Sequence, residues 1–540
     1  MTRNLAGFIL FAALLSAQST APAKPGKVEG VVINSVTNDP VKKAAVTLQG
    51  LGSRTNYSVV TDATGHFHFE SVDPGQYQAM AYRDGFMPPQ GNRFNPMSKP
   101  IAVAEEQQVK DLVMKLLPLA VVNGHVVDED GDPLVRSQVQ AMRYVYRQGG
   151  VRQLQPAGFA TTNDLGEFQL LDLEPGRYYF LAAAQPQMAR LPANTKSAEP
   201  EQTYPNTFYP SASDAEQSAS TVVAAGAQVN GIDFRLHKAP AFHIRGKAVD
   251  GRTGEPIRNG RIRVQTRPGV FFNNALVRQN GSFEVRGAVS GSYTLILQTQ
   301  DQLMVRQIID VGDHDVDDVA LVLRPALEIS GTVRWEGNPP AGQRRGQMRI
   351  SLNSLEMGSA SNAAVNADGS FALKATPAVY QIFAGCDAGA YLKSIHFGDQ
   401  DVSNGKLDLT QLTTGSLTIV CGADVGQIQG SVQTESGEAA AHALITIGPD
   451  EERQYRMDLH YQLMSDQNGK FDYQDFAPGD YKVFAWESAD ADPQMLQSTE
   501  FRKAFESRAV PVSVPLGGKA SVQLKLISAA DIEAEKNKLP

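Results

Sequence analysis

Short stretches of the chain alternate between apolar and polar residues and are bounded by turn residues. The clearest example is the stretch 61–82, TDATGHFHFESVDPGQYQAMAY, in which Phe67 and Phe69 alternate with two histidines. Gly65 ends an Asp-containing turn before these phenylalanines, a Pro-Gly turn follows them, and Tyr77 opens another alternating run. Alternation of this kind is typical of half-buried strands, so the stretch predicts two strands joined by a tight turn.

The same arrangement of a glycine turn, a phenylalanine, a second turn and a tyrosine recurs along the whole chain. The later copies contain the pairs Phe168 and Tyr178, Phe283 and Tyr293, Phe371 and Tyr380, and Phe471 and Tyr481. From turn glycine to tyrosine the spacing is about twelve residues in each copy, which indicates an internal repeat. The fourth copy is the least regular, because Pro377-Ala378-Val379 replaces its Pro-Gly turn.

Each repeat also opens with a glycine-containing strand, and every copy except the fourth closes with a recurring pair of apolar segments, such as Ile101–Val103 and Val109–Leu116 in the first copy. Every copy therefore supplies about seven short strands with turns every 8 to 12 residues, and nothing between them is typical of a long helix. The pattern predicts an all-β chain built as a tandem array of about five antiparallel, seven-stranded β-sandwich domains.

The length of 540 residues agrees with this count, because units of roughly 85 to 120 residues are a normal size for one small sandwich. The second unit carries an aromatic and proline-rich loop, and the fourth is divergent and holds a cysteine pair. The expected segments are a signal peptide at 1–19, sandwich domains at 27–119, 120–240, 241–326, 327–426 and 427–528, and a charged tail at 529–540.

The beginning of the chain has the pattern of an export signal. Arg3 precedes the apolar run Leu5–Leu15, and Ala17-Gln18-Ser19 provides small residues for cleavage. The run is too short to span a bilayer, so a secretory signal peptide is expected, with the mature protein in the periplasm or outside the cell. No cysteine near this site can accept a lipid, and no second long apolar run follows, so neither a lipid anchor nor a membrane span is expected.

Composition and charge narrow the class of partner. With 42% hydrophobic and 20% charged residues, the chain is typical of a globular, turn-rich protein. A net charge of -9 argues against nucleic acid or an anionic membrane as partner. The locally basic segment 245–267 is interpreted as an exposed strand face offset by the acidic segment 310–318.

The combined motifs resemble a known family. The sequence resembles the carboxypeptidase regulatory-like domain in its succession of motifs, which is G-x-V, a Pro-containing turn, T-D-x-x-G-x-F-x-F and P-G-x-Y. This resemblance implies a transthyretin-like or prealbumin-like sandwich, related to immunoglobulin-like and carbohydrate-binding-like folds, in an exported bacterial protein. Such domains are generally non-catalytic accessories, and a fold does not define a function.

The marks of catalysis and of cofactor binding are missing. The sequence has no H-E-x-x-H, G-x-S-x-G or P-loop motif, so neither catalytic residues nor a cofactor are expected. His66 and His68 share one strand face but lack an identifiable third ligand, so an exposed face is favoured over a metal site. Asp128, Asp130 and Asp132 resemble the start of a calcium loop, yet Gly131 is misplaced for one, and an acidic turn is the favoured interpretation.

Aromatic residues are the candidate ligand-binding groups, because sugars stack on flat rings. Tyr204, Phe208 and Tyr209 are concentrated in a proline-stiffened loop. Trp486 is out of phase with Tyr481, which places the indole on the solvent-facing side of its strand if the tyrosine faces inward. The alternative is that these rings pack on their own domain or on an adjacent one.

The two cysteines of the chain both fall in the fourth domain. Cys386 shares a strand face with Tyr380, and Cys421 shares another with Leu417, so both sulfur atoms are expected to point into one core. Since an exported protein meets an oxidising compartment, we predict a disulfide, with two buried free thiols as the alternative.

Two functions follow from these patterns, and the favoured one is a non-enzymatic exported scaffold or interaction protein that contacts cell-envelope proteins. The alternative is a carbohydrate-binding protein of the cell envelope or extracellular space. An exposed aromatic surface would favour the alternative, and burial of all four rings would favour the scaffold. The sequence leaves the ligand and the oligomeric state open.

Overall fold

The computed structural model describes residues 24–536 and 538, apart from 53–54, 89–99, 147–151, 185–200, 267–269, 300–303, 325, 338–347, 356–359, 387–388, 411–414 and 488–491. The expected signal peptide at 1–19 lies outside the described residues. The chain divides into two compact units, each described by itself: residues up to 124 with 169–177 and 222–232, and the remaining residues.

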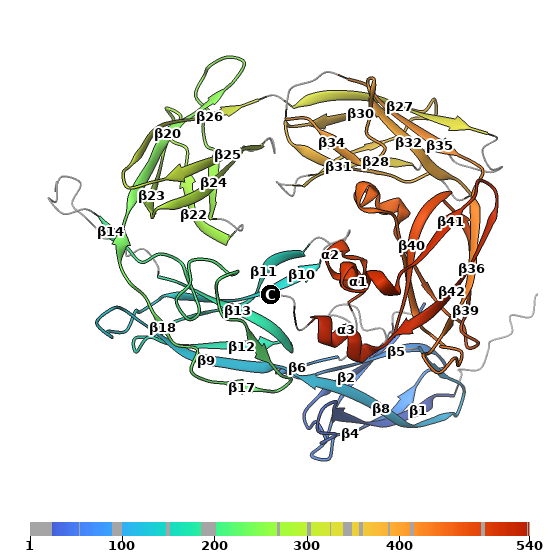
Figure 1. Ribbon diagram of the computed structural model, residues 1–540. Helices are drawn as coiled ribbons and strands as arrows, with labels where there is room; N and C mark the ends of the chain where they lie inside the picture. Colours follow the sequence, from blue (N-terminus) through green and yellow to red (C-terminus); the bar gives the residue numbers. More distant parts are fainter. Residues whose placement is uncertain are drawn as a thin grey trace, which may run out of the picture. The chain divides into compact units, whose positions relative to one another are not determined.

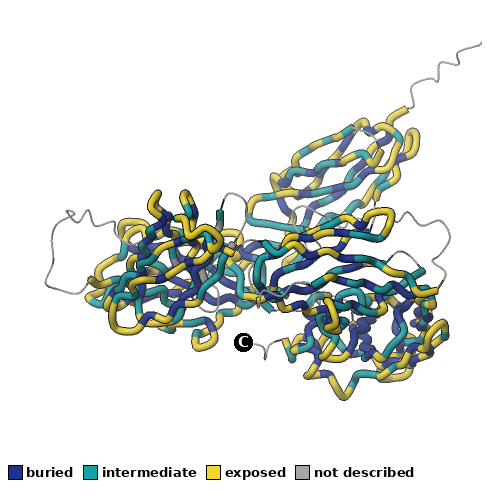
Figure 2. The backbone as a smooth tube through the Cα atoms, turned by 90° about the horizontal axis from the view of Figure 1, so that it is seen from above, coloured by how far each residue is buried: buried dark blue, intermediate teal, exposed yellow. Residues whose placement is uncertain are grey.

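The described elements are almost all strands, arranged as successive sheets (Figure 1). Along many strands buried positions alternate with exposed ones, whereas β37 is buried throughout; the turns are largely exposed (Figure 2). The all-β prediction is therefore confirmed, while the residue boundaries of the five domains remain predictions.

The first domain is a sandwich of two four-stranded sheets with the orders β4-β1-β8-β6 and β3-β2-β5-β7. Val28 of one sheet and Val46 of the other belong to the same buried cluster, so the core lies between the sheets. The strands are β1 (Gly26–Asn34), β2 (Ala45–Gly50), β3 (Asn56–Val60), β4 (His66–Val72), β5 (Gly75–Tyr82), β6 (Phe86–Met87), β7 (Ile101–Val103) and β8 (Gln108–Pro118).

The pairing of β1 departs from a purely antiparallel arrangement. β1 pairs antiparallel with β4, but it pairs parallel with the closing strand β8, with Gly30 opposite Leu112. A parallel pair requires a long connection, which the intervening strands supply. The pairs β2–β3, β2–β5, β5–β7 and β6–β8 of this domain are antiparallel, as expected.

The strands of the second domain are shared between the two compact units. Its sheets have the orders β11-β10-β13-β15, with β16 beside β13, and β12-β9-β17, with β18 beside β9. A two-stranded sheet pairs β14 with β19. The strands are β9 (Ala120–Val127), β10 (Gln138–Tyr146), β11 (Arg152–Thr161), β12 (Glu167–Leu173), β13 (Gly176–Ala183), β14 (Gln202–Thr203), β15 (Thr207–Phe208), β16 (Thr221–Val223), β17 (Gln228–Val229), β18 (Phe234–Arg235) and β19 (Ala239–Pro240).

The third domain again has two sheets, with the orders β23-β20-β26 and β22-β21-β24-β25. Ile244 and Ile262, one from each sheet, lie in one buried cluster. The strands are β20 (Phe242–Asp250), β21 (Arg261–Thr266), β22 (Val270–Leu276), β23 (Ser282–Ala288), β24 (Gly291–Gln298), β25 (Met304–Val311) and β26 (Val316–Leu323).

The fourth domain has sheets with the orders β30-β27-β35-β32-β33 and β29-β28-β31-β34. Ile329 and Ile350 bring the two sheets together in one core. The strands are β27 (Leu327–Glu336), β28 (Arg349–Ser354), β29 (Ala360–Ala364), β30 (Ser370–Ala375), β31 (Val379–Ala384), β32 (Tyr391–Phe397), β33 (Gln400–Asp401), β34 (Lys406–Asp408) and β35 (Leu417–Gly422).

The fifth domain is a seven-stranded sheet of order β38-β37-β40-β42-β36-β39, with β41 beside β40. Ile532, in the segment expected to be a charged tail, is buried in the same apolar cluster as Trp486. The elements are β36 (Gly426–Gln433), β37 (Leu444–Gly448), β38 (Tyr461–Met464), β39 (Lys470–Phe476), β40 (Gly479–Trp486), β41 (Val510–Val514), β42 (Lys519–Ile527), α1 (Pro493–Gln497), α2 (Thr499–Lys503), α3 (Ala529–Lys536) and the one-turn 3-10 helices η2 (Glu451–Arg453), η3 (Met457–Leu459) and η4 (Glu506–Arg508).

The glycine turns adopt the backbone conformation that the repeat predicts. Gly65 has φ +75° and Gly469 has φ +72°, a region that favours glycine. A Cβ atom on Gly469 would also lie 2.6 Å from the Val432 carbonyl oxygen. The repeated glycine is therefore required by both conformation and space.

The repeated tyrosine closes the second turn of its copy. The Tyr77 hydroxyl donates to the Asp73 carbonyl oxygen at 2.7 Å, and the Tyr481 hydroxyl donates to that of Ala477 at 2.8 Å. Both rings are buried, so the polar end of a core side chain is paired with the backbone of the turn. The hydroxyls of Tyr293 and Tyr380 likewise donate to the carbonyl oxygen of the residue four positions earlier in the chain.

Candidate functional site

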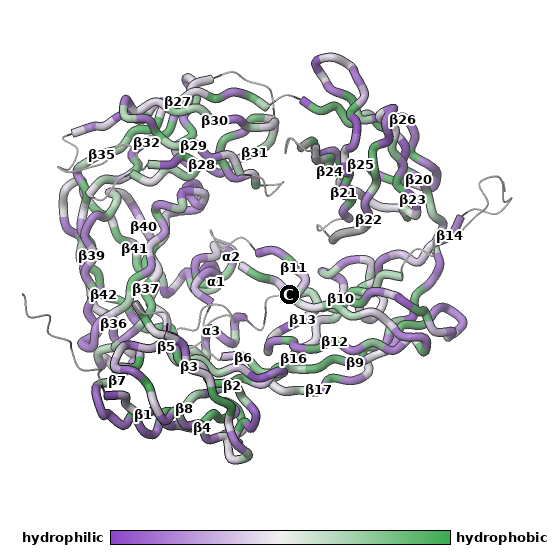
Figure 3. Tube along the Cα trace, turned by 180° about the vertical axis from the view of Figure 1, so that it is seen from behind, coloured by the Kyte–Doolittle hydropathy of each residue, from purple (hydrophilic) through white to green (hydrophobic). Residues whose placement is uncertain are grey.

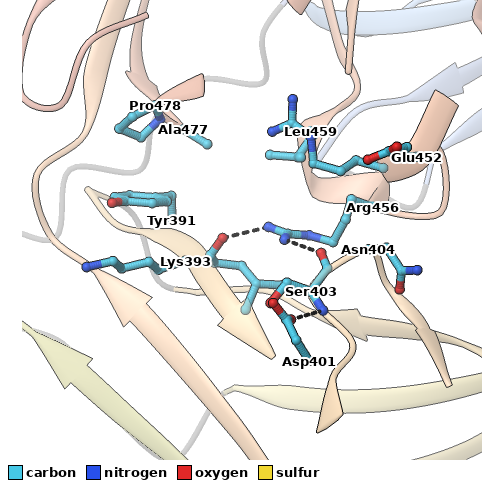
Figure 4. A pocket seen from close by; sticks show the side chains of 12 residues that line it. Tyr391, Lys393, Asp401, Ser403, Asn404, Glu452, Arg456, Leu459, Ala477 and Pro478 are labelled. Carbon is cyan, nitrogen blue, oxygen red and sulfur yellow. Dashed lines mark hydrogen bonds between the residues drawn. The ribbon is translucent and has the colours of Figure 1, made fainter. Parts of the chain in front are cut away.

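A cavity of about 350 Å³ lies where the fourth and fifth domains meet, inside the second compact unit. The fourth domain contributes β32 and the turn after β33, and the fifth contributes the segment of η2 and η3 and a turn before β40 (Figure 4). The cavity is lined by Tyr391, Leu392, Lys393, Asp401, Ser403, Asn404, Glu452, Arg453, Arg456, Leu459, Ala477 and Pro478.

Arg456 connects the two domains at this cavity. Its guanidinium donates to the carbonyl oxygens of Leu392 at 2.6 Å and Ser403 at 2.9 Å, both in the fourth domain. It also donates to the Asp458 carboxylate at 2.7 and 2.8 Å. Because Arg456 is only 3% exposed and a buried charge needs full pairing, these bonds favour one fixed placement of the two domains.

Further contacts at this junction also connect the fourth domain with the fifth. The Gln381 side-chain amide donates to the Tyr455 carbonyl oxygen at 2.8 Å. The Tyr391 ring packs against the core cluster of the fifth domain, although Tyr391 belongs to the fourth. The sequence does not reveal this junction, because residues 451–459 connect two strands and have no apolar periodicity that would mark them.

Most charged groups at the cavity are already engaged. The pKa of the Asp401 carboxyl is lowered by hydrogen bonds from Ser403, chiefly from its side chain. Lys393 pairs with Glu336, which raises the pKa of the lysine. Arg453 pairs with Asp450 at 3.3 Å. The walls therefore offer paired charges and a partly buried tyrosine to a polar ligand or to partner side chains.

Two polar side chains of the cavity are engaged in hydrogen bonds with the backbone. The Ser403 hydroxyl is engaged with the backbone of Ile395, accepting from its N–H at 2.9 Å. Asp401 accepts from the Ser403 N–H rather than orienting a base. Among the described residues that line the cavity there is no imidazole, and the arrangement is suited to binding.

The predicted exposure of Trp486 is wrong. Its side chain is fully buried, and its ring stacks on Phe484 with centroids 5.3 Å apart. Phe501 of α2 and Phe505 lie against it. The residues after β40 form helices that cover the outer face of the strand, and an alternating pattern within the strand does not reveal such a cover.

The aromatic loop of the second domain is partly a structural element. Phe208 is 2% exposed and lies in β15, which pairs with β13, so its ring is not available to a ligand. The half-buried Tyr209 ring lies 5.8 Å from that of Phe234, and Lys238 lies 5.5 Å from the Tyr204 ring. The rings thus pack largely on their own domain, and Tyr204 and Tyr209 keep part of their surface exposed.

The predicted disulfide is present. Cys386 and Cys421 are bonded, with Cα atoms 6.0 Å apart. Cys421 is fully buried, and Cys386 packs against the same core, as the strand phase indicated. The bond connects the segment just after β31 with β35 in the least regular domain.

The remaining sequence candidates lie on the surface. His66 and His68 are exposed, and the Asp128 carboxylate accepts from the N–H groups of Asp130 and Asp132 at 3.0 and 2.9 Å, as in an acidic turn. Within the described ranges, His, Cys, Asp and Glu side chains form no group of three or more that could hold a metal ion. No helix among the described residues has the length and apolar character to cross a membrane.

Arg245, at the start of the basic segment of the third domain, is paired with the acidic segment as expected. Arg245 donates to Asp315 at 2.8 Å, to Asp317 at 3.1 Å and to Glu284 at 3.1 Å. Burial alone would raise the pKa of Glu284, but hydrogen bonds from Arg286, His243 and Arg245 outweigh it and lower that pKa to about 2. The charge of Arg245 is therefore matched by acidic side chains.

The family model of the carboxypeptidase regulatory-like domain matches residues 27–109, which agrees with the resemblance in the sequence. The match covers the first sandwich domain. In the third, fourth and fifth domains, the opening strand pairs parallel with the closing strand, as β1 does with β8 in the first domain. No curated protein matches this chain.

Among solved structures, three similar chains come from Gram-positive bacteria. BcpA, the major pilin subunit of Bacillus cereus, has 10% identity and a TM-score of 0.17, with 56% of this chain and 99% of that chain covered. The Bacillus anthracis TIE protein has 8% identity and a TM-score of 0.16, with 76% of this chain and 74% of that chain covered. The minor pilin GBS52 of Streptococcus agalactiae has 14% identity and a TM-score of 0.17, with 42% of this chain and 100% of that chain covered. Scores this low do not define a shared arrangement of whole chains.

Proposed function

We propose that this protein is a non-enzymatic, exported scaffold that holds successive β-sandwich domains in a set geometry and presents them to cell-envelope partners. The main support is the Arg456 junction, where a buried cation donates to two backbone carbonyl oxygens of the neighbouring domain. Flexible arrays do not need such a junction, because interdomain motion is the default for weak interfaces. Export is supported by the pattern of residues 1–19 and by the disulfide.

The rigid junction is tested by distance measurement between the fourth and fifth domains. Spin labels on non-cysteine handles at the exposed Lys374 and Lys525 leave the disulfide intact. The parent protein is expected to give a narrow distance distribution, and Arg456→Ala a broad one. Lys406→Ala is the control, since its ammonium lies 5.8 Å from the Tyr455 ring at the surface of the same junction. A broad distribution in the parent would overturn the proposal.

Export has its own test. We expect protein recovered outside the cytoplasm to begin at Thr20, which the mass of its N-terminal peptide would show. Recovery of a chain that starts at Met1 from the cytoplasm alone would contradict export.

Carbohydrate binding is the second candidate, and it is supported by the partial exposure of Tyr204 and Tyr209. Retention on a polysaccharide column should then be lost in the double variant Tyr204→Ala, Tyr209→Ala. Trp486 and Phe208 are excluded from this test because both are buried.

A further inference from the structure

Arg502 is a buried cation in the fifth domain. It lies on α2, is 7% exposed, and its guanidinium makes no hydrogen bond or ion pair with the described part of the chain. Buried arginines are normally paired, because a guanidinium is not deprotonated in proteins and is costly to remove from water. Burial lowers the pKa of Arg502 to about 10, so the group stays charged at neutral pH.

The guanidinium is held in place by its surroundings. A side chain at Gly448 would collide with Nη1, so the glycine at the end of β37 leaves space for the arginine. The Phe484 ring lies 5.9 Å from Cζ. The charge is thus fixed at the wall of a cavity of about 40 Å³, which Phe484, Thr499 and Arg502 help to line.

The other charges around this cavity already have partners. Lys482 pairs with Glu506, and Lys503 pairs with Glu451 at 2.9 Å. Asp450 pairs with Arg453 at 3.3 Å. Of the cations that line this cavity, Arg502 is therefore the one without an ion pair of its own among the described residues.

His460 adds no charge of its own. Burial, followed by the positive charge of Arg502, lowers the pKa of His460 to about 4, so its imidazole is neutral at pH 7. Its Nδ1 is buried and has no partner among the described residues. The negative charge of Glu506 also acts on Arg502, but this carboxylate is already paired with Lys482, so it is not an ion-pair partner of the arginine.

We propose that this cavity binds a carboxylate, with the Arg502 guanidinium as its main donor. A planar carboxylate matches the two parallel N–H donors of an arginine. The volume suits a group of a few atoms and excludes a sugar ring. The carboxylate has two possible sources, a free small acid or the chain end of a peptide.

The test uses the full chain with Trp335→Phe, so that Trp486 beside the cavity is the one fluorescent tryptophan. Its thermal unfolding is followed in sodium acetate and in sodium chloride of equal ionic strength. Acetate should raise the midpoint by about 2 to 4 °C at saturating concentration, because a ligand of the folded state stabilises it. Arg502→Met should abolish this shift, and its midpoint in chloride should not be lower than that of the parent, since it removes an unpaired buried charge.

Arg508→Gln is the matched control, because Arg508 lies on the next helical turn, pairs with Glu435 and is outside the cavity lining. It should keep the acetate shift. Equal midpoints of the parent in acetate and chloride, or an unchanged shift in Arg502→Met, would overturn the proposal. If the methionine variant fails to fold, Arg502→Lys replaces it, because lysine keeps the charge but lacks the planar guanidinium. An undiminished acetate shift in the lysine variant would also overturn the proposal.

Triglycine and triglycine amide separate the two sources. A shift with triglycine at lower concentration than acetate, and none with the amide, supports a peptide chain end as ligand. A shift with acetate but not with triglycine supports a free small acid.

Discussion

The indole Nε1 of Trp486 donates a hydrogen bond to the Thr446 hydroxyl at 2.8 Å, and both side chains are fully buried. The two residues lie on the neighbouring strands β40 and β37. This bond pairs the one polar atom of the tryptophan inside the cluster that α1, α2 and α3 complete.

Thr446→Val keeps the shape of the side chain and removes the acceptor. We expect a loss of about 1 to 3 kcal/mol in the free energy of unfolding of the fifth domain, because the buried N–H is left unpaired. Denaturant unfolding followed by Trp486 fluorescence measures this loss. Thr446→Ser retains the hydroxyl and should keep the Trp486 bond; equal stability of the valine variant and the parent would contradict the role of the bond.

Gly469→Val should destabilise the fifth domain by about 1 to 3 kcal/mol, since valine is strained at φ +72°. Gly437→Val is the matched control in the same domain: Gly437 has φ +86°, but a Cβ there meets nothing within 4 Å. Unfolding midpoints of the two variants separate strain from collision. A smaller effect at Gly469 than at Gly437 would show that the close approach to Val432 is unimportant.

Removal of the disulfide by the double variant Cys386→Ala, Cys421→Ala should lower the stability of the fourth domain by roughly 3 to 4 kcal/mol on the chain-entropy estimate. Trp335, which packs against that core, reports the unfolding. Protein purified without reductant should take up no alkylating reagent when denatured. Uptake of two equivalents would mean that the bond does not form.

The Glu284 cluster should make the third domain acid-sensitive. The folded pKa of Glu284, about 2, lies below its ordinary value of 4.5, so its contribution is complete above pH 4.5 and is lost as the pH falls toward 2. Hydrogen exchange of β20 and β23 between pH 2.5 and 6 should therefore show weaker protection at the acid end. Glu284→Gln should flatten this dependence, and an equally steep profile in that variant would contradict the assignment.

The sequence was informative where local physics decides structure. The alternation around Phe67, the turn at Gly65 and the strand phase of Cys386 depend on neighbours within a few residues, and the structure agrees with each. A map of hydropathy along the chain shows the same alternation in most strands (Figure 3).

The misses come from contacts between distant segments. Trp486 is covered by helices that follow its strand, and Arg456 acts on carbonyl oxygens more than fifty residues away. The parallel partner of β1 is likewise set by how the whole sandwich closes. None of these relationships leaves a periodic signal in its own segment.

The parallel pairing of opening and closing strands has a mechanical consequence. A pull on the two ends of such a domain loads this pair in shear, so that its hydrogen bonds resist together instead of peeling one at a time. In the fifth domain the pair runs from Gln427 to Gln433, whereas in the second the closing strand is interrupted and β18 meets β9 at only two positions. Under tension the second domain should therefore yield first, at the lowest force in a single-molecule stretching experiment, and act as the extensible link between stiffer neighbours.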